Sequence, residues 1–187
     1  MKKGKALKSW MLLAVLVLLV AVPFAAQRAR LSMYPQKYSD QVSRYAEEYG
    51  IDENVIYAII RTESGFNPTA ESDAGARGLM QITRETFEWI KTKIAPEEEL
   101  GFDSLFDPQI NIRFGTYFLA ACMRLYDGDL ATASAAYHSG VGKVNELLQQ
   151  SEYSADGRTL HTFPYSQMSN YVHKVQKNYQ QYCQLYS

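Results

Sequence analysis

The sequence predicts a mainly α-helical domain with an apolar segment before it. Two observations lead to the helical class. Apolar residues recur at intervals of three and four through most of the chain, and residues typical of helix caps stand between these stretches. Continuous strand-like alternation is absent apart from what residues 65–78 supply. A chain of 187 residues with 47% hydrophobic content suits one compact domain, here 31–187, after a segment spanning 1–30.

The segment spanning residues 1–30 has a basic start followed by an uninterrupted apolar run from Trp10 to Val22. This pattern is typical of an export signal or a membrane anchor. The run is short for a membrane span, which favours a cleaved signal and a secreted protein. Phe24, however, interrupts the small-x-small pattern of a cleavage site. We expect an uncleaved anchor in the cell membrane, with the domain on the extracytoplasmic side.

Charge and composition restrict the kinds of partner. Residues 1–30 hold six of the 19 basic residues and none of the 20 acidic ones, so the remaining chain has 13 basic residues and a net charge of −7. Such an acidic domain argues against nucleic acid. No His/Cys cluster has metal-ligand spacing, and we expect no metal and no cofactor. Cys122 and Cys183 are predicted either to form a disulfide or to remain two buried thiols.

The first half of the domain is expected to contain three helices and one loop. A helix whose buried face includes Val42 and Tyr49 ends at Gly50, and Asp52 caps the next helix. A loop rich in glycine covers residues 65–78. After this loop, Thr83 is expected to cap a helix that carries Phe87 and Ile90.

The second half is expected to contain four more helices. Asp107 followed by Pro108 marks the start of a long helix, because an aspartate cap and a proline in the first turn both favour initiation. Asp129 opens a helix that runs through Tyr137. Residues 141–148 form a further helix, and the polar segment 151–165 is a loop. The faces expected to be buried are Ile110, Phe114, Tyr117, Phe118, Ala121 and Leu125 in the long helix, and Val172, Val175, Tyr179 and Tyr182 in the last one.

Glu63 is the candidate acid, because it closes the apolar helical run that Asp52 begins. Gly65 and Pro68 follow it and end the helix, which leaves a lone carboxylate at the negative end of the helix dipole. The dipole and the neighbouring apolar side chains both disfavour the ionised carboxylate, so they raise its pKa. A carboxylic acid that keeps its proton near neutral pH can protonate a leaving group. The alternative for this fragment alone is a solvated surface glutamate.

Four ordered blocks of sequence carry a family resemblance. They are residues 63–82 (ESGFNPTAESDAGARGLMQI), 106–115 (FDPQINIRFG), 135–140 (AAYHSG) and 171–175 (YVHKV). Together they resemble the soluble lytic transglycosylase domain, found in lysozyme-like bacterial enzymes that cut peptidoglycan glycan strands. The resemblance spans about residues 38–183, and it implies a lysozyme-like helical fold with a substrate cleft.

The resemblance implies a mechanism with one acid. In that family a single glutamate, here Glu63, protonates the glycosidic oxygen between N-acetylmuramic acid and N-acetylglucosamine. The acetamido oxygen and then the C6 hydroxyl of the substrate replace water, which gives a 1,6-anhydromuramoyl end. Glu71 and Asp73 are expected in a solvated loop, and the acids at 85, 88 and 97–99 on the surface.

The same resemblance implies substrate-binding residues. Ser72 matches a serine thought to steady the glutamate or the acetamido group, although a hydroxyl in a loop turn is an equal alternative. Gln81 matches a residue able to hydrogen-bond sugar, and Met80 matches a cleft residue that is more plausible as packing. Asn111 is interpreted as a structural amide.

Two tyrosines and a histidine complete the predicted site. Tyr137 matches a tyrosine that packs on a sugar face, and the hydroxyl of Tyr171 is expected to point at the catalytic carboxyl. His138 stands where the family typically has Asn, with Ser139 in place of Ala. Gln167 stands four residues before Tyr171, where relatives often have Glu. These departures bear on activity or on subsite preference, and they leave Glu63 unaffected.

Three classes of function compete for this domain. The first is a membrane-anchored lytic transglycosylase acting on peptidoglycan. The second is a hydrolysing muramidase, which usually needs a second acid that the sequence does not offer. The third is a non-catalytic peptidoglycan-binding or assembly protein, which the intact blocks around Glu63 and Gln81 argue against.

Overall fold

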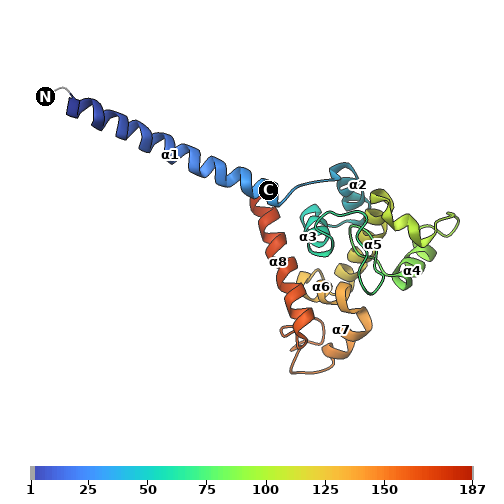
Figure 1. The fold of residues 1–187 in the computed structure, drawn as a ribbon. Coiled ribbons are helices and arrows are strands. Elements are labelled where there is room, and N and C mark those ends of the chain that lie inside the picture. The colour runs from blue at the N-terminus through green and yellow to red at the C-terminus, as the bar shows by residue number, and fades with distance from the viewer. Residues whose placement is uncertain (1–2, 187) are drawn as a thin grey trace. The chain divides into compact units, whose positions relative to one another are not determined.

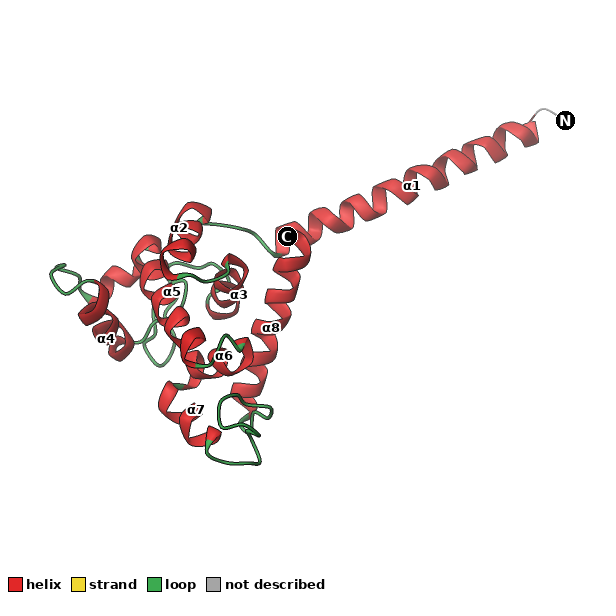
Figure 2. Ribbon diagram, turned by 180° about the vertical axis from the view of Figure 1, so that it is seen from behind, coloured by secondary structure: helices red, strands yellow, loops and turns green. Residues whose placement is uncertain are grey.

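A computed structural model describes residues 3–186, with backbone alone for residues 3–16. The chain divides into two compact units, 1–35 and 36–187. Helices and connecting loops make up the second unit, and the described residues include no β-strand (Figures 1 and 2). Its elements are α2 (Ser39–Tyr49), α3 (Glu53–Glu63), α4 (Arg84–Ile94), the 3₁₀ helix η1 (Phe102–Phe106), α5 (Pro108–Leu125), α6 (Leu130–Ser139), α7 (Val141–Leu148) and α8 (Ser166–Tyr186).

The first unit contains one long helix, α1 (Lys3–Met33), with Pro23 inside it. Apolar side chains between Val17 and Phe24 are exposed. Within the part of the chain whose side chains the structure describes, no helix is long and apolar enough to cross a membrane. The apolar run predicted from Trp10 to Val22 begins among residues 10–16, whose side chains lie outside that description.

The predicted helix boundaries of the second unit are confirmed, because the expected caps make their hydrogen bonds. A side-chain oxygen of Asp52 accepts from the backbone N–H of Asn54 at 2.8 Å, and Gly50 ends α2 with φ of 67°. Three further helices begin with the same kind of bond, made by Thr83, Asp107 and Asp129. These bonds satisfy N–H groups that the first turn of a helix leaves without a partner.

Helix α3 lies in the core, since every residue from Val55 to Ile60 is buried. It packs against α8, which also packs along α6 and runs the length of the unit (Figure 1). Helix α5 contacts α2, α4, α6 and η1, so buried side chains occur on several of its faces. Because α3 is closely packed among its neighbours, the side chain at its end has little freedom to move.

Several details differ from the sequence prediction. Of the α5 residues predicted to be buried, Phe114 is buried, Leu125 is 53% exposed, and four are only partly buried: Ile110, Tyr117, Phe118 and Ala121. Tyr179 is only partly buried, whereas Val172, Val175 and Tyr182 are buried as predicted. The helix η1 was not predicted. Cys122 and Cys183 are free cysteines, the first buried and the second partly buried.

Candidate active site

Glu63 is the last residue of α3, and the chain turns sharply after it. Ser64 is the C-cap, and its hydroxyl donates to the carbonyl of Leu79 at 2.8 Å. Gly65 and Phe66 then take positive φ values of 57° and 69°. A positive φ is unusual for phenylalanine, and here it places the ring in the core, 4% exposed. The turn therefore ends the helix at the carboxylate and brings the loop 64–83 back over it.

The carboxylate of Glu63 is partly buried and has one short hydrogen bond. The hydroxyl of Tyr171, on α8, donates to Glu63 Oε1 at 2.6 Å. Burial raises the pKa of Glu63 from 4.5 to about 7, while the Tyr171 hydrogen bond acts in the opposite direction and lowers it. Burial is the larger effect, because removing a carboxylate from water penalises its charged form. Near neutral pH, a substantial fraction of Glu63 therefore carries a proton.

Tyr137, on α6, closes the other side of the site. It is 9% exposed, and its hydroxyl donates to the carbonyl of Met80 at 2.8 Å. Its ring centroid lies 5.1 Å from that of Phe118 on α5. Burial, and then the charge of Glu63, raise the pKa of Tyr137 well above its ordinary value. Two neutral tyrosines therefore interact with the single carboxylate.

Asn111 holds the loop 64–83 in place, as its interpretation as a structural amide predicted. It is fully buried on α5. Its oxygen accepts from the N–H of Met80 at 2.8 Å, and its Nδ2 donates to the carbonyls of Arg77 at 2.9 Å and Leu105 at 2.8 Å. Gly78 has φ of 75°, and a Cβ there would overlap the Asn111 amide. Only glycine fits this approach of backbone to side chain.

Three predicted substrate residues lie in this loop. Met80 is fully buried and packs against Gly115, so its side chain holds the loop and is not exposed to a sugar. The amide nitrogen of Gln81 donates to the carbonyls of Ala70 and Gly78 at 3.1 and 2.9 Å, so sugar binding by Gln81 depends on its side-chain oxygen. Ser72 is exposed, and its hydroxyl accepts from the N–H of Ala76 at 3.1 Å, as expected for a hydroxyl in a loop turn. The predicted role of Ser72 beside Glu63 stays a prediction.

The two acids that follow Glu63 most closely in the sequence, Glu71 and Asp73, are both exposed. Glu71 is exposed and forms an ion pair with Arg77 at 3.1 Å, and Arg77 also pairs with Asp103. Asp73 is exposed on the same loop. The prediction of a solvated loop is thus confirmed for both acids. No carboxylate contributes to the pKa of Glu63 among the groups that the structure describes.

His138 and Gln167 line one cavity of about 490 Å³ beside Tyr171, together with Pro164, Tyr165 and Met168. The ring of His138 stacks on that of Tyr171, with centroids 4.3 Å apart and an angle of 11° between planes. Partial burial lowers the pKa of His138. The two positions that the sequence analysis singled out, His138 and Gln167, therefore meet at one edge of the site.

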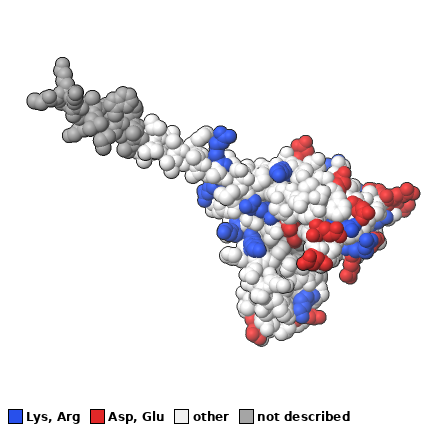
Figure 3. All heavy atoms as spheres, viewed as in Figure 1, with Lys and Arg blue, Asp and Glu red and all other residues white. Residues whose placement is uncertain are grey.

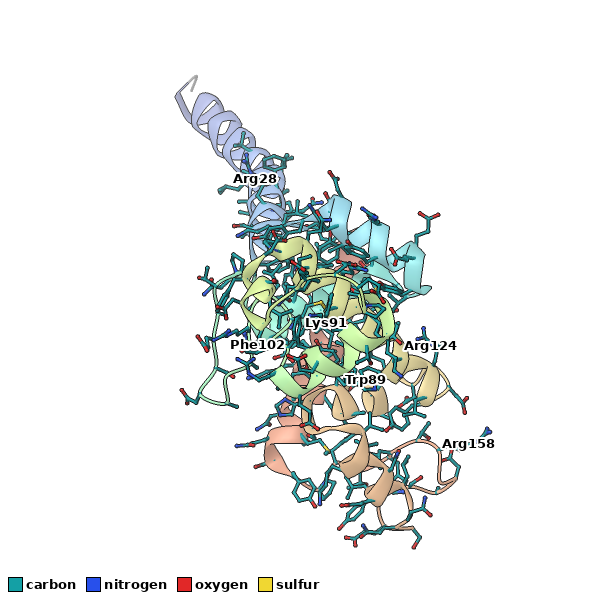
Figure 4. All side chains as sticks on the ribbon, turned by 90° about the vertical axis from the view of Figure 1, so that its right-hand side faces the viewer. Arg28, Trp89, Lys91, Phe102, Arg124 and Arg158 are labelled. Atoms are coloured by element: carbon teal, nitrogen blue, oxygen red, sulfur yellow. The ribbon has the colours of Figure 1, made fainter. Side chains whose placement is uncertain are left out.

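A second cavity, of about 630 Å³, lies between α4, α5 and the start of α7. Phe118 and Trp89 line it, with ring centroids 6.0 Å apart, and Trp89 extends from α4 with 43% of its surface exposed (Figure 4). Since Phe118 also packs on Tyr137, this cavity continues the site away from Tyr171. A third cavity, of about 680 Å³, lies near Asp52 at the other end of α3, remote from the carboxylate of Glu63.

Two site residues were not predicted from the sequence. Ser64 ties the end of α3 to the loop, and Phe118 joins Tyr137 to the 630 Å³ cavity. The exposed acids of the second unit gather on the side that carries α4 (Figure 3). Among the described side chains, no group of three or more His, Cys, Asp or Glu is placed to hold a metal ion.

The fold and the site together define a lysozyme-like helical domain with one buried acid at the end of a core helix. The chain belongs to the transglycosylase SLT domain family, whose profile matches residues 40–159. Its sequence is 34% identical to the membrane-bound lytic murein transglycosylase C of Edwardsiella ictaluri, over 76% of this chain and 46% of that protein. It is 32% identical to the soluble lytic murein transglycosylase of Salmonella typhimurium, over 76% of this chain and 22% of that protein.

Solved structures show the same fold. The 70 kDa soluble lytic transglycosylase of Escherichia coli aligns with a TM-score of 0.73 and 28% identity, over 82% of this chain and 25% of that one. A complex of a 70 kDa soluble lytic transglycosylase with bulgecin A aligns with a TM-score of 0.74 and 26% identity, over 95% and 28% of the two chains. The present chain thus spans less than half the length of each of these relatives.

Proposed function

We propose that this domain is a peptidoglycan lytic transglycosylase that cleaves the β-1,4 bond between N-acetylmuramic acid and N-acetylglucosamine. The observation that carries the proposal is the single buried carboxyl of Glu63, whose pKa of about 7 suits a general acid at neutral pH. Family membership supports the same reaction.

The reaction needs one acid because the substrate supplies both nucleophiles. Protonated Glu63 gives its proton to the glycosidic oxygen, and the C1–O bond breaks as the acetamido oxygen of the muramoyl residue attacks C1. Ionised Glu63 then accepts the proton of the C6 hydroxyl, whose oxygen attacks C1 and releases the acetamido group. Glu63 ends protonated as it began, and the product carries a 1,6-anhydro ring without consuming water.

The residues around Glu63 have supporting roles in this proposal. Tyr171 stabilises the ionised form that the second step requires, since its hydroxyl donates to Oε1. Tyr137, Gln81 and Ser72 are proposed to face the sugar on the loop side, and His138 on the side of the smaller cavity. The 630 Å³ cavity, with the exposed indole of Trp89, offers an apolar face on which a pyranose ring can stack.

Mass spectrometry of products released from purified peptidoglycan tests the proposal. The expected muropeptides lack one water relative to hydrolysed ones, and a reaction in heavy-oxygen water leaves their muramoyl ends unlabelled. A labelled reducing end would assign the protein to the hydrolysing muramidases. Binding of glycan without any cleavage would favour the non-catalytic class.

We also propose that the N-terminal segment holds the enzyme at the cell membrane, with the catalytic unit on the extracytoplasmic side. The basic start and apolar run of the sequence support this, as do the relatives named as membrane-bound. The full-length chain should then sediment with membranes and resist extraction by alkaline carbonate. Recovery of a secreted form that begins near Gln27 would contradict the anchor.

A further inference from the structure

Two successive contacts join the candidate acid to side chains of two other helices. His138 of α6 stacks face to face on Tyr171 of α8, with ring centroids 4.3 Å apart. Tyr171 in turn donates its hydroxyl to Glu63 of α3 at 2.6 Å. The histidine therefore contacts the donor of the catalytic hydrogen bond, and it does so through the face of the ring.

We infer that His138 is a positioning residue, whose ring holds Tyr171 in the orientation in which the tyrosine hydroxyl donates to Glu63. The catalytic consequence of this role rests on the function proposed above. The positioning role itself does not rest on that function, because its effect on the pKa of Glu63 can be measured without any substrate.

Geometry explains why one ring controls the other. The hydroxyl of a tyrosine stands at the far end of its ring, so a small rotation about the side-chain torsions moves it out of reach of an acceptor. Near-parallel rings at this separation attract each other beyond the area that they bury. An asparagine amide at position 138, by comparison, would have no aromatic face to offer.

The titratable groups around the site determine how this positioning role affects the pKa of Glu63. The titratable groups that interact with Glu63 are the hydroxyls of Tyr171 and Tyr137, and the thiol of Cys122 interacts with both tyrosines. Burial lowers the pKa of His138, so its imidazole is neutral at neutral pH and stacks as a neutral ring. The Tyr171 hydrogen bond lowers the pKa of Glu63. Loss of the orientation should therefore raise that pKa further.

The test compares His138→Ala with Tyr171→Phe, alone and combined. Each single variant should lower kcat/KM about fivefold, the effect of one net hydrogen bond, and should move the alkaline limb of the pH profile to higher pH. The combined variant should show no further change, because both substitutions remove the same interaction. His138→Phe, which keeps a ring, should recover most of the loss. His161→Ala, in the exposed loop 149–165, is the matched histidine control.

Titration of the Glu63 carboxyl by NMR in protein labelled with ¹³C-glutamate gives the same answer without catalysis. His138→Ala and the milder His138→Asn should both raise the observed pKa of Glu63. Additive effects in the double variant, or a change in KM alone with an unmoved Glu63 pKa, would overturn the inference in favour of a substrate contact. A raised Glu63 pKa in a protein that cuts no glycan would uphold the positioning role and refute the proposed function instead.

Discussion

Glu63 and Asp156 are two carboxylates that the same chain treats in opposite ways. Glu63 ends the core helix α3, and burial raises its pKa to about 7. Asp156 lies in the exposed loop 149–165, near the outward-pointing Arg158 (Figure 4). It accepts hydrogen bonds from the N–H groups of Arg158 at 2.8 Å and Thr159 at 2.9 Å, which lower its pKa to about 2.

The difference shows how backbone surroundings decide what an acid can do. The N–H groups of a turn stabilise negative charge, and an acid placed there stays ionised and serves the local structure. The carboxyl end of a buried helix presents carbonyls and apolar side chains, and an acid placed there retains its proton. Only the second acid can donate a proton near neutral pH.

Exchanging each acid for its amide is the strongest way to break this comparison. Glu63→Gln keeps the shape but removes the transferable proton, so it should lower the rate of glycan cleavage by at least ~10² to 10⁴. Asp156→Asn should retain the wild-type rate, as should Asp73→Asn in the exposed part of the loop 64–83. The rate of release of anhydromuropeptides measures all three. A Glu63→Gln enzyme with near wild-type turnover would refute the mechanism.

The loop 64–83 should also depend more strongly on a distant residue for its stability than the loop 149–165 does. The loop beside Glu63 depends on Asn111, and Asn111→Ala leaves one N–H and two carbonyls without their buried partner. We expect a loss of roughly 3 to 5 kcal/mol in the free energy of unfolding, measured by urea denaturation. Asn170→Ala, at an exposed position of α8, is the control and should change stability little. A loss for Asn111→Ala as small as that for Asn170→Ala would show that the loop does not need Asn111.

Stability should depend on pH in the direction set by Glu63. Its pKa is raised in the folded state, so its protonated form stabilises the fold fully below pH 4.5, and this contribution is lost as pH rises through about 7. Glu63→Gln cannot ionise and should therefore be more stable than wild type above pH 7, by at most about 3 kcal/mol. Urea unfolding between pH 4 and 8 tests this. A difference between the two proteins that does not vary with pH would contradict the raised pKa.

Asp156 should give the smallest effect and the opposite sign. Its pKa is lowered in the folded state, so its ionised form stabilises the loop above pH 3.8, and this contribution is lost as pH falls through about 2. Asp156→Asn should unfold at a slightly lower temperature than wild type at neutral pH. The gap between the two melting temperatures should close on acidification. A gap that persists at pH 2 would show that the carboxylate charge is not the cause.

Much of the fold could be predicted because helix caps are local chemistry. Asp52, Thr83, Asp107 and Asp129 each bind N–H groups two or three residues ahead, and such bonds are visible in the sequence. Leu125 was misplaced because it continues the apolar stripe of α5, whereas its side chain borders the 630 Å³ cavity. Periodicity alone does not show where those neighbours stop.

The site was predictable only where a motif joined distant residues. Glu63 and Tyr171 lie 108 residues apart, and the expectation that they meet came from the family resemblance. Ser64 and Phe118 were missed, since a serine after a helix and a phenylalanine in an apolar stripe have no distinguishing local signal. The contact of His138 with Tyr171 depends on how α6 packs against α8, which no spacing in the sequence specifies.

Helix α8 contacts both ends of α3 through tyrosine hydroxyls. Tyr171 reaches Glu63 at the carboxyl end, and Tyr179 donates to Asp52 at the amino end at 3.0 Å. A ribosome synthesises α3 before α8, so Glu63 is present in the nascent chain before Tyr171, its hydrogen-bond donor. The hydrogen bond between Tyr171 and Glu63 can therefore form only after the 108 residues that follow Glu63 have been synthesised.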